Sequence, residues 1–438
     1  MVTESTPLVP IAEISEPLNS SKTSARTLCI LLGSTQLVLS ILFLTSTTYN
    51  FTEYSQAEYV IFRDIMVMLL LGFGFLMTFL KNYGLGAVGL TMMLTVIAVQ
   101  LNIFVEFGAR FLSGAAGSVG TVLPLPLGVA SIIDGEFSAA TLLISYGAII
   151  GRTSPAQLVI MALLQSFFYA FNKVIVVFCF CGAEDVGGTM TIHMFGAYFG
   201  LAVSGALGGP KRSTTSKSSP NRVSDLLSLI GTTLLWVYWP SFVGATETGV
   251  PAYERLCVMH TIFALLGSSG ATYFMTVYLC QHGKFDPVHI ANSTLAGGVA
   301  VGASARLAMT PGGALLVGVV AGTVSVLGYK YSTPMLESWL GVYDTCGVGN
   351  LHGWPSILGG LASAIFVIVD SKAEFLVYGG YVQGFHQLMA VGGTLIVAIG
   401  SGYLTGSIMS KTVSKAPDEY EDGVWWEGPY FDEEAHEA

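Results

Sequence analysis

The sequence predicts an all-α integral membrane protein with about 12 transmembrane helices, arranged as a five-plus-five inverted repeat. Three observations support this fold class. Of the 438 residues, 52% are hydrophobic and only 11% are charged, whereas soluble proteins carry about 25% charged residues. Apolar runs long enough to cross a bilayer recur along the whole chain. Two of these runs begin with the same spacing of Asp, Gly and His.

The remaining composition is consistent with a packed helical bundle. The mean hydropathy is +0.66, and the 52 glycines favour close contact between helices in a membrane. The six cysteines are scattered in apolar surroundings, so we interpret them as small packing residues. Cys179 and Cys181 lack nearby partners at metal-site spacing, and we expect no metal and no cofactor. Much of the net charge of −10 lies in the C-terminal tail, and nothing indicates a nucleic-acid partner.

Twelve apolar runs are long enough to span a bilayer of lipid. The spans 127–151 and 349–370 are the least regular, because Pro and Gly interrupt their approaches. Residues 1–26 then form an N-terminal tail, 27–410 the transmembrane domain, and 411–438 an acidic C-terminal tail. The twelve predicted spans are 27–47, 60–80, 85–109, 127–151, 155–178, 186–207, 224–244, 253–279, 287–308, 311–331, 349–370 and 384–410.

The basic residues predict the orientation, because cytoplasmic segments of membrane proteins are enriched in Lys and Arg. With the N-terminus inside, an even number of spans also places the C-terminal tail in the cytoplasm. Asn50, in the sequon Asn50-Phe51-Thr52, then lies outside and is the predicted glycosylation site. Cytoplasmic segments would hold 12 of the 18 basic residues: Lys22, Arg26, Lys81, Arg152, Lys211, Arg212, Lys217, Arg222, Lys284, Lys330, Lys411 and Lys415.

The internal repeat is carried by DVGGTMTIH and DTCGVGNLH. In each, a His follows an Asp by eight residues: His193 after Asp185, and His352 after Asp344. The two motifs begin the sixth and eleventh spans, so they enter the membrane from opposite faces, as in an inverted repeat. Eight helical residues rise about 12 Å, nearly half of a hydrocarbon core of about 30 Å. We therefore expect the two imidazoles to meet near the midplane.

Ionisable side chains at membrane depth mark functional sites by default. A His bonded to a neighbouring backbone group, with a purely structural role, is the alternative for either ring alone. Two His on facing helices could also ligate one haem iron. For Asp185 and Asp344 a helix-capping role is at least as good as direct contact with a substrate.

Five stretches extend the pattern, and two of them begin with the repeat motifs: GFGFLMTFLKNYG (72–84), DVGGTMTIHMFGAYFGL (185–201), YWPSF (238–242), VHIANSTLAGGVAVG (288–302) and DTCGVGNLHGWPSILGG (344–360). With these motifs, and VWWEGP in the tail, the sequence resembles the Rh glycoproteins of the ammonium transporter superfamily. The resemblance implies a homotrimer in the plasma membrane, embedded in the lipid bilayer, with a narrow pore in each subunit. It implies a channel rather than an enzyme. The implied substrate is ammonia or ammonium, with carbon dioxide as a second candidate.

The resemblance also implies roles for individual residues. His193 and His352 match the paired pore histidines, and Asp185 and Asp344 match the carboxylates at the pore-helix starts. The other matches are Phe137 and Phe242, which would close the outer mouth as a gate, and Glu337, an acidic residue of the inner vestibule.

Two residues depart from the family pattern: Lys173 lies where relatives tend to carry an outer-vestibule acid, and Val243 where Asn is usual. Some Rh proteins lack both histidines and act as non-conducting scaffolds, so a scaffold that binds cytoplasmic proteins through its tails is the alternative function. Because this chain keeps both rings, we expect electroneutral passage of ammonia, with ammonium losing its proton at the mouth.

Overall fold

The computed structural model describes residues 12–50, 56–114, 123–210, 215–247, 250–371 and 373–428. Within these ranges, eleven helical segments are long and apolar enough to cross a membrane. Several of them join an α-helix to a π-helical or 3-10 stretch, named η. The first six segments are α1 (Ala12–Ser46); α2 (Gln56–Val67) with η1 (Met68–Phe73), α3 (Gly74–Leu76) and η2 (Met77–Phe79); α4 (Gly84–Leu112); α5 (Val129–Ile149); α6 (Pro155–Ala170) with η3 (Phe171–Phe180); and η4 (Thr189–Met194) with α7 (Phe195–Leu207).

The second half of the chain supplies the other five segments. They are α8 (Arg222–Gly244); α9 (Pro251–Leu279); α12 (Pro311–Leu327) with η7 (Gly328–Ser332), α13 (Thr333–Met335) and η8 (Leu336–Leu340); η9 (Gly349–Gly353) with α14 (Trp354–Val369); and α15 (Gly380–Thr412). Short elements complete the described fold: the parallel strands β1 (Thr47–Tyr49) and β2 (Leu125–Leu127), and the 3-10 turns η5 (Thr215–Ser218) and η10 (Asp422–Val424).

The predicted span 287–308 is not one continuous helix, and it is therefore absent from the eleven long helical segments. It consists of α10 (Pro287–Ser293), α11 (Ala296–Val301) and the 3-10 turn η6 (Gly302–Ser304). The segment is buried throughout its centre, and its glycines lie against other backbones and rings. A Cβ on Gly298 would lie 2.6 Å from Trp239 Nε1, and one on Gly302 would lie 2.8 Å from the carbonyl oxygen of Gly187. The break therefore follows from close packing inside the protein, where irregular backbone is tolerated in a membrane.

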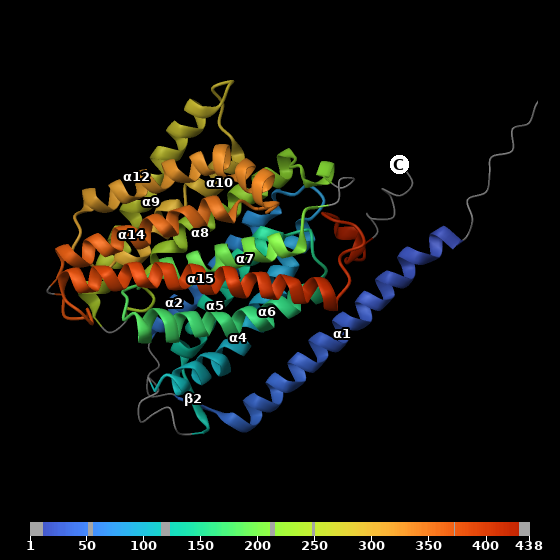
Figure 1. The fold of residues 1–438 in the computed structure, drawn as a ribbon, viewed down its shortest axis with the longest axis horizontal. Coiled ribbons are helices and arrows are strands. Elements are labelled where there is room, and N and C mark those ends of the chain that lie inside the picture. The colour runs from blue at the N-terminus through green and yellow to red at the C-terminus, as the bar shows by residue number, and fades with distance from the viewer. Residues whose placement is uncertain are drawn as a thin grey trace, which may run out of the picture.

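The helices form one bundle, with α1 along its edge (Figure 1). The bundle's core contains Trp239 and the aromatic rings of α5 and α7. Figure 1 also shows that α1 slants away from the bundle, and that its N-terminal end lies at the same end of the molecule as the C-terminal segment. Both termini of the described chain therefore lie on one side of the bundle.

Residues 413–428 pack against the helix ends on what we term the tail side. The Asp422 carboxylate accepts hydrogen bonds from the backbone N–H groups of Leu85 and Gly86, at 2.7 and 2.6 Å. It thereby caps the start of α4. Lys217 pairs with Asp418 at 2.6 Å, which ties the segment to the loop before α8. Burial raises the pKa of Asp422 to about 6.

Candidate functional site: a path through the bundle

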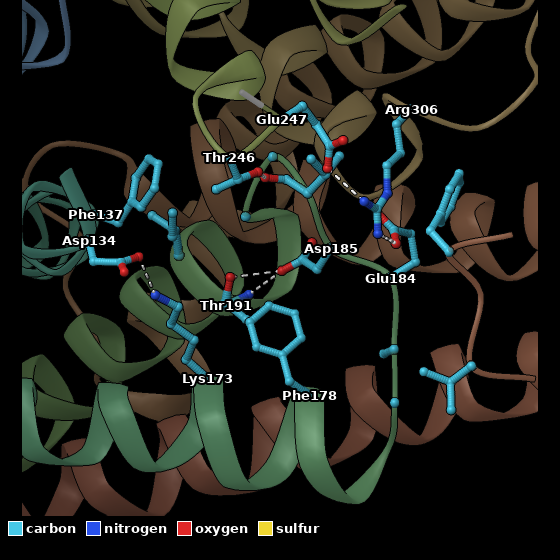
Figure 2. Close-up of a pocket in the computed structure, with 18 of the residues that line it drawn as sticks. Asp134, Phe137, Lys173, Phe178, Glu184, Asp185, Thr191, Thr246, Glu247 and Arg306 are labelled. Atoms are coloured by element: carbon cyan, nitrogen blue, oxygen red, sulfur yellow. Dashed lines mark hydrogen bonds and ion pairs between the residues drawn. The ribbon is translucent and has the colours of Figure 1, made fainter. Parts of the chain in front are cut away.

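A cavity of about 400 Å³, which we term the vestibule, opens on the side opposite the tail. It lies between the start of α5, the end of η3, residues 182–188 and the loop that carries Arg306 (Figure 2). Arg306 donates to both oxygens of Glu184 and, at 2.6 Å, to Glu247. These ion pairs link the loop after η6 to two other loops and fix the rim of the vestibule.

Lys173 is held by two carboxylates on one wall of the vestibule. Its Nζ lies 2.9 Å from Asp134 Oδ1 and 3.1 Å from either oxygen of Glu106, and Figure 2 shows the pair with Asp134. The vestibule's described lining has four acidic groups and three basic ones. Lys173 therefore neutralises charge on the wall, and the vestibule attracts a cation only slightly.

Asp185 and Asp344 cap the two repeat helices in equivalent ways. The Asp185 carboxylate accepts from the N–H groups of Met190 and Thr191 and from the Thr191 hydroxyl, at 2.7–3.1 Å. The Asp344 carboxylate accepts from three successive N–H groups, those of residues 347–349, at 2.8–3.0 Å. The geometry is that of a helix cap in both cases.

Two glycines allow these caps to form. Gly188 and Gly347 have φ values of +69° and +77°, a backbone conformation that side chains with a Cβ rarely adopt. Both caps lie just outside the spanning segments. There, burial raises the pKa of Asp185 to about 7 and that of Asp344 to about 6, while the backbone hydrogen bonds act in the opposite direction.

Phe137 and Phe242 lie together below the vestibule. Their ring centroids are 5.2 Å apart and their planes are nearly perpendicular, at 89°. Both rings are buried, with 4% and 1% of their surface exposed. Phe137 lines the vestibule, and Phe242 lies 5.9 Å, centroid to centroid, from His193. The two phenylalanines thus separate the vestibule from the first histidine.

His193 and His352 meet in the centre of the bundle. Their Nδ1 atoms are 3.2 Å apart, and their rings are stacked at 12° with centroids separated by 5.1 Å. A hydrogen bond between two Nδ1 atoms requires one ring to donate and the other to accept, so the two neutral rings hold opposite tautomers. His193 Nε2 is buried with no hydrogen-bond partner among the described residues.

Aromatic rings that had no predicted role enclose the histidine pair. Trp239 stacks on His193 at 5.5 Å between centroids, and Phe73 stacks on His352 at 6.2 Å. Both residues occur in motifs that carry the family resemblance, YWPSF and GFGFLMTFLKNYG. Their place in these motifs was the only sequence feature that pointed to a role for them. The direct contact between the rings, and a neighbouring void of only about 10 Å³, leave no room for a haem between them.

The path continues from His352 to the tail side. The small void lies next to His352, and beyond it a cavity of about 240 Å³, the inner cavity, is lined by Asp344 and Tyr329. Asn292 and Cys346 line both spaces. Glu337 lies on the exposed surface of η8 and is not part of the inner cavity's described lining.

Asn50 follows β1, and its backbone N–H donates to the carbonyl oxygen of Leu127 at 2.9 Å. Phe51 and Thr52, the rest of its sequon, lie outside the described residues. Leu127 lines a second cavity together with Arg110 and Asp134, two residues that also line the vestibule, so Asn50 lies near the vestibule.

A multi-span helical bundle with an inverted repeat and a polar pair in its apolar centre is the architecture of a membrane transport protein. The sequence profile of the Ammonium Transporter Family matches residues 27–423. The chain belongs to this family, in its Rh branch, and is a multi-pass membrane protein.

Individual relatives cover most of the chain. It is 38% identical to the ammonium transporter Rh type B of Danio rerio over 87% of this chain and 84% of that protein. The corresponding human protein is also 38% identical, over 92% of both chains. Among solved structures, Rh50 of Nitrosomonas europaea, described as one of the Rhesus protein family of channels, matches with a TM-score of 0.72 and 33% identity, over 87% of this chain and 95% of that one.

Proposed function

We propose that the protein is a channel that passes ammonia in its neutral form. The observation that carries the proposal is the order of features through the bundle: the vestibule, the rings of Phe137 and Phe242, the bonded pair of His193 and His352, and the inner cavity. The two rings provide hydrogen-bonding atoms in the apolar centre, where an unpaired polar molecule would otherwise lose all its contacts with water.

The walls of the path favour a neutral species. The side chains around the small void next to His352 are mostly apolar. Moving a bare cation into such surroundings costs tens of kcal/mol by Born estimates. Ammonium would therefore lose its proton in the vestibule, and ammonia would pass between the phenylalanines to His193. The faces of these rings can hold ammonium briefly by cation–π attraction, worth about 0.5–2 kcal/mol.

Asp185 acts in this proposal as a helix cap that holds the His193 helix in place. Its two oxygens already accept hydrogen bonds from the backbone and from Thr191, so proton acceptance from ammonium is left to water in the vestibule. Asp344 has the same task on the tail side. Glu337, exposed on η8, would attract cations to the mouth on the tail side.

The assembly and its orientation are also part of the proposal. The protein lies in the plasma membrane as a homotrimer, with a pore in each subunit and residues 1–26 and 411–438 in the cytoplasm. The side that bears Asn50 and the vestibule faces outward, and Asn50 is glycosylated. The exposed apolar side chains of α1, including Ile30 and Leu37, would be covered by lipid or by a neighbouring subunit.

The test is electrical and optical together. Purified protein in liposomes receives an ammonium gradient while the internal pH and the membrane current are recorded. We expect a rapid change of internal pH in proportion to the amount of protein, with no accompanying current. A current that scales with protein and disappears in His193→Leu would overturn neutral passage in favour of charge transport. A pH response no faster than that of empty liposomes would favour the scaffold alternative. Loading carbonic anhydrase and applying a carbon dioxide gradient tests the second substrate.

A further inference from the structure

Asn292 has an unused acceptor on the tail side of the histidine pair. The residue lies near the end of α10, in the broken span, and only 5% of its surface is exposed. Its Nδ2 donates to the carbonyl oxygen of Val288 at 3.0 Å. Its Oδ1 is buried with no hydrogen-bond partner among the described residues. Buried polar atoms are nearly always paired, so this oxygen requires an explanation.

The position of Asn292 between two cavities explains why this oxygen has no protein partner. It lines both the small void next to His352 and the inner cavity that opens toward the tail side. The void has a volume of about 10 Å³, close to the minimum for a single water-sized molecule. Apart from Asn292, its described polar lining consists of the His352 ring and the thiol of Cys346. A thiol is a weak hydrogen-bonding group, so the Asn292 carbonyl is the strong acceptor between His352 and the inner cavity.

We propose that Asn292 Oδ1 binds neutral ammonia on the tail side of the histidine pair, as the step between His352 and the inner cavity. This proposal rests on the ammonia channel proposed above. Ammonia carries three N–H donors, and beyond the His352 ring this oxygen is the strong side-chain acceptor that the small void offers them. A single neutral hydrogen bond holds the molecule only weakly, which allows it to leave into the inner cavity.

Three variants separate this role from the structural bond to Val288. Asn292→Leu has nearly the same size but neither donates nor accepts. Asn292→Thr can donate its hydroxyl to the carbonyl oxygen four residues earlier, so it keeps the structural bond, but its shorter side chain withdraws the acceptor from the void. Asn292→Asp, buried and therefore protonated, retains an oxygen acceptor at the Oδ1 position and can donate its hydroxyl to Val288.

The measurement is the rate of internal pH change in liposomes after an ammonium gradient, for folded variants matched in amount. We expect Asn292→Leu and Asn292→Thr to conduct about tenfold more slowly than the wild type, the rate equivalent of one lost hydrogen bond. We expect Asn292→Asp to remain within about twofold of the wild type, because its acceptor is retained. If Asn292→Leu fails to fold, the difference in flux between Asn292→Thr and Asn292→Asp still tests the proposal.

The outcomes distinguish this inference from the proposed function. Wild-type flux in Asn292→Thr would reduce Asn292 to a structural residue of α10. Flux that is lost in His352→Leu but unchanged in all three Asn292 variants would overturn the inference and leave the channel in place. A wild-type protein that conducts no ammonia would overturn both.

Discussion

Replacing His352 by Leu tests the central element of the path. The two Nδ1 atoms are 3.2 Å apart, so the substitution removes a hydrogen bond and leaves His193 with two unpaired ring nitrogens. Leu fills a similar volume against Phe73, and we expect the bundle to stay folded. Passing ammonia loses one hydrogen-bonding partner, worth about 1–3 kcal/mol in a buried site. Because about 1.4 kcal/mol changes a rate tenfold, we expect flux to fall by about five- to 150-fold.

The assay is stopped-flow recording of internal pH in liposomes that contain equal amounts of folded protein. The matched control is His282→Leu, because His282 is exposed in the loop before α10 and touches no part of the path. We expect this control to match the wild type. The same flux in His352→Leu and in the control would refute the reasoning, since the ring pair would then be a packing feature only.

Three other substitutions have definite expected outcomes. Lys173→Met leaves the vestibule carboxylate of Asp134 without its Nζ partner, while Glu106 keeps Arg110. The ammonium concentration for half-maximal flux should therefore fall by about two- to fivefold at low ionic strength and less in high salt. An unchanged value at low salt would count against Lys173 as a neutralising group. Because burial raises the pKa of Asp422 from 3.8 to about 6, the docked tail disfavours the ionised carboxylate, and docking should weaken as pH rises from about 4 through about 6. Protease protection of the C-terminal segment at pH 5 and pH 7 measures this, and Asp422→Asn should abolish the pH difference. In Gly318→Ala the new Cβ would overlap the carbonyl oxygen of Ala264, so overpacking should destabilise the protein by about 1–3 kcal/mol and lower its melting temperature. Gly270 has open space around it, so Gly270→Ala should leave the melting temperature unchanged.

The repeat and most of the spans could be predicted from the sequence because the bilayer imposes them. A helix that crosses hydrocarbon needs about 20 apolar residues, and that requirement is visible in composition alone. The spacing from Asp185 to His193 and from Asp344 to His352 was equally informative, since helical rise converts it into depth. The meeting of the two rings follows from that spacing and from the opposite directions of the two helices.

The broken span at 287–308 was predicted as a continuous helix, because its composition is as apolar as that of its neighbours. In the structure, the Trp239 side chain approaches Gly298 and the backbone of the Gly187 loop approaches Gly302, so the segment is packed from both sides where it is broken. The hydropathy pattern of one segment does not predict which other segments pack against it. Lys173 is a similar case, since its effect on the vestibule depends on Glu106 and Asp134, which lie 67 and 39 residues away in the chain.

The sequence was therefore sufficient to predict which segments enter the membrane, that two of them repeat with opposite direction, and which ionisable residues reach its centre. These features depend on local length, spacing and hydropathy. Only the tertiary structure decided that Trp239 and Phe73 enclose the histidines, that Lys173 is neutralised, and that Asn292 holds an unpaired oxygen next to His352. Each of these depends on contacts between residues far apart in the chain, which the packing of the whole bundle brings together.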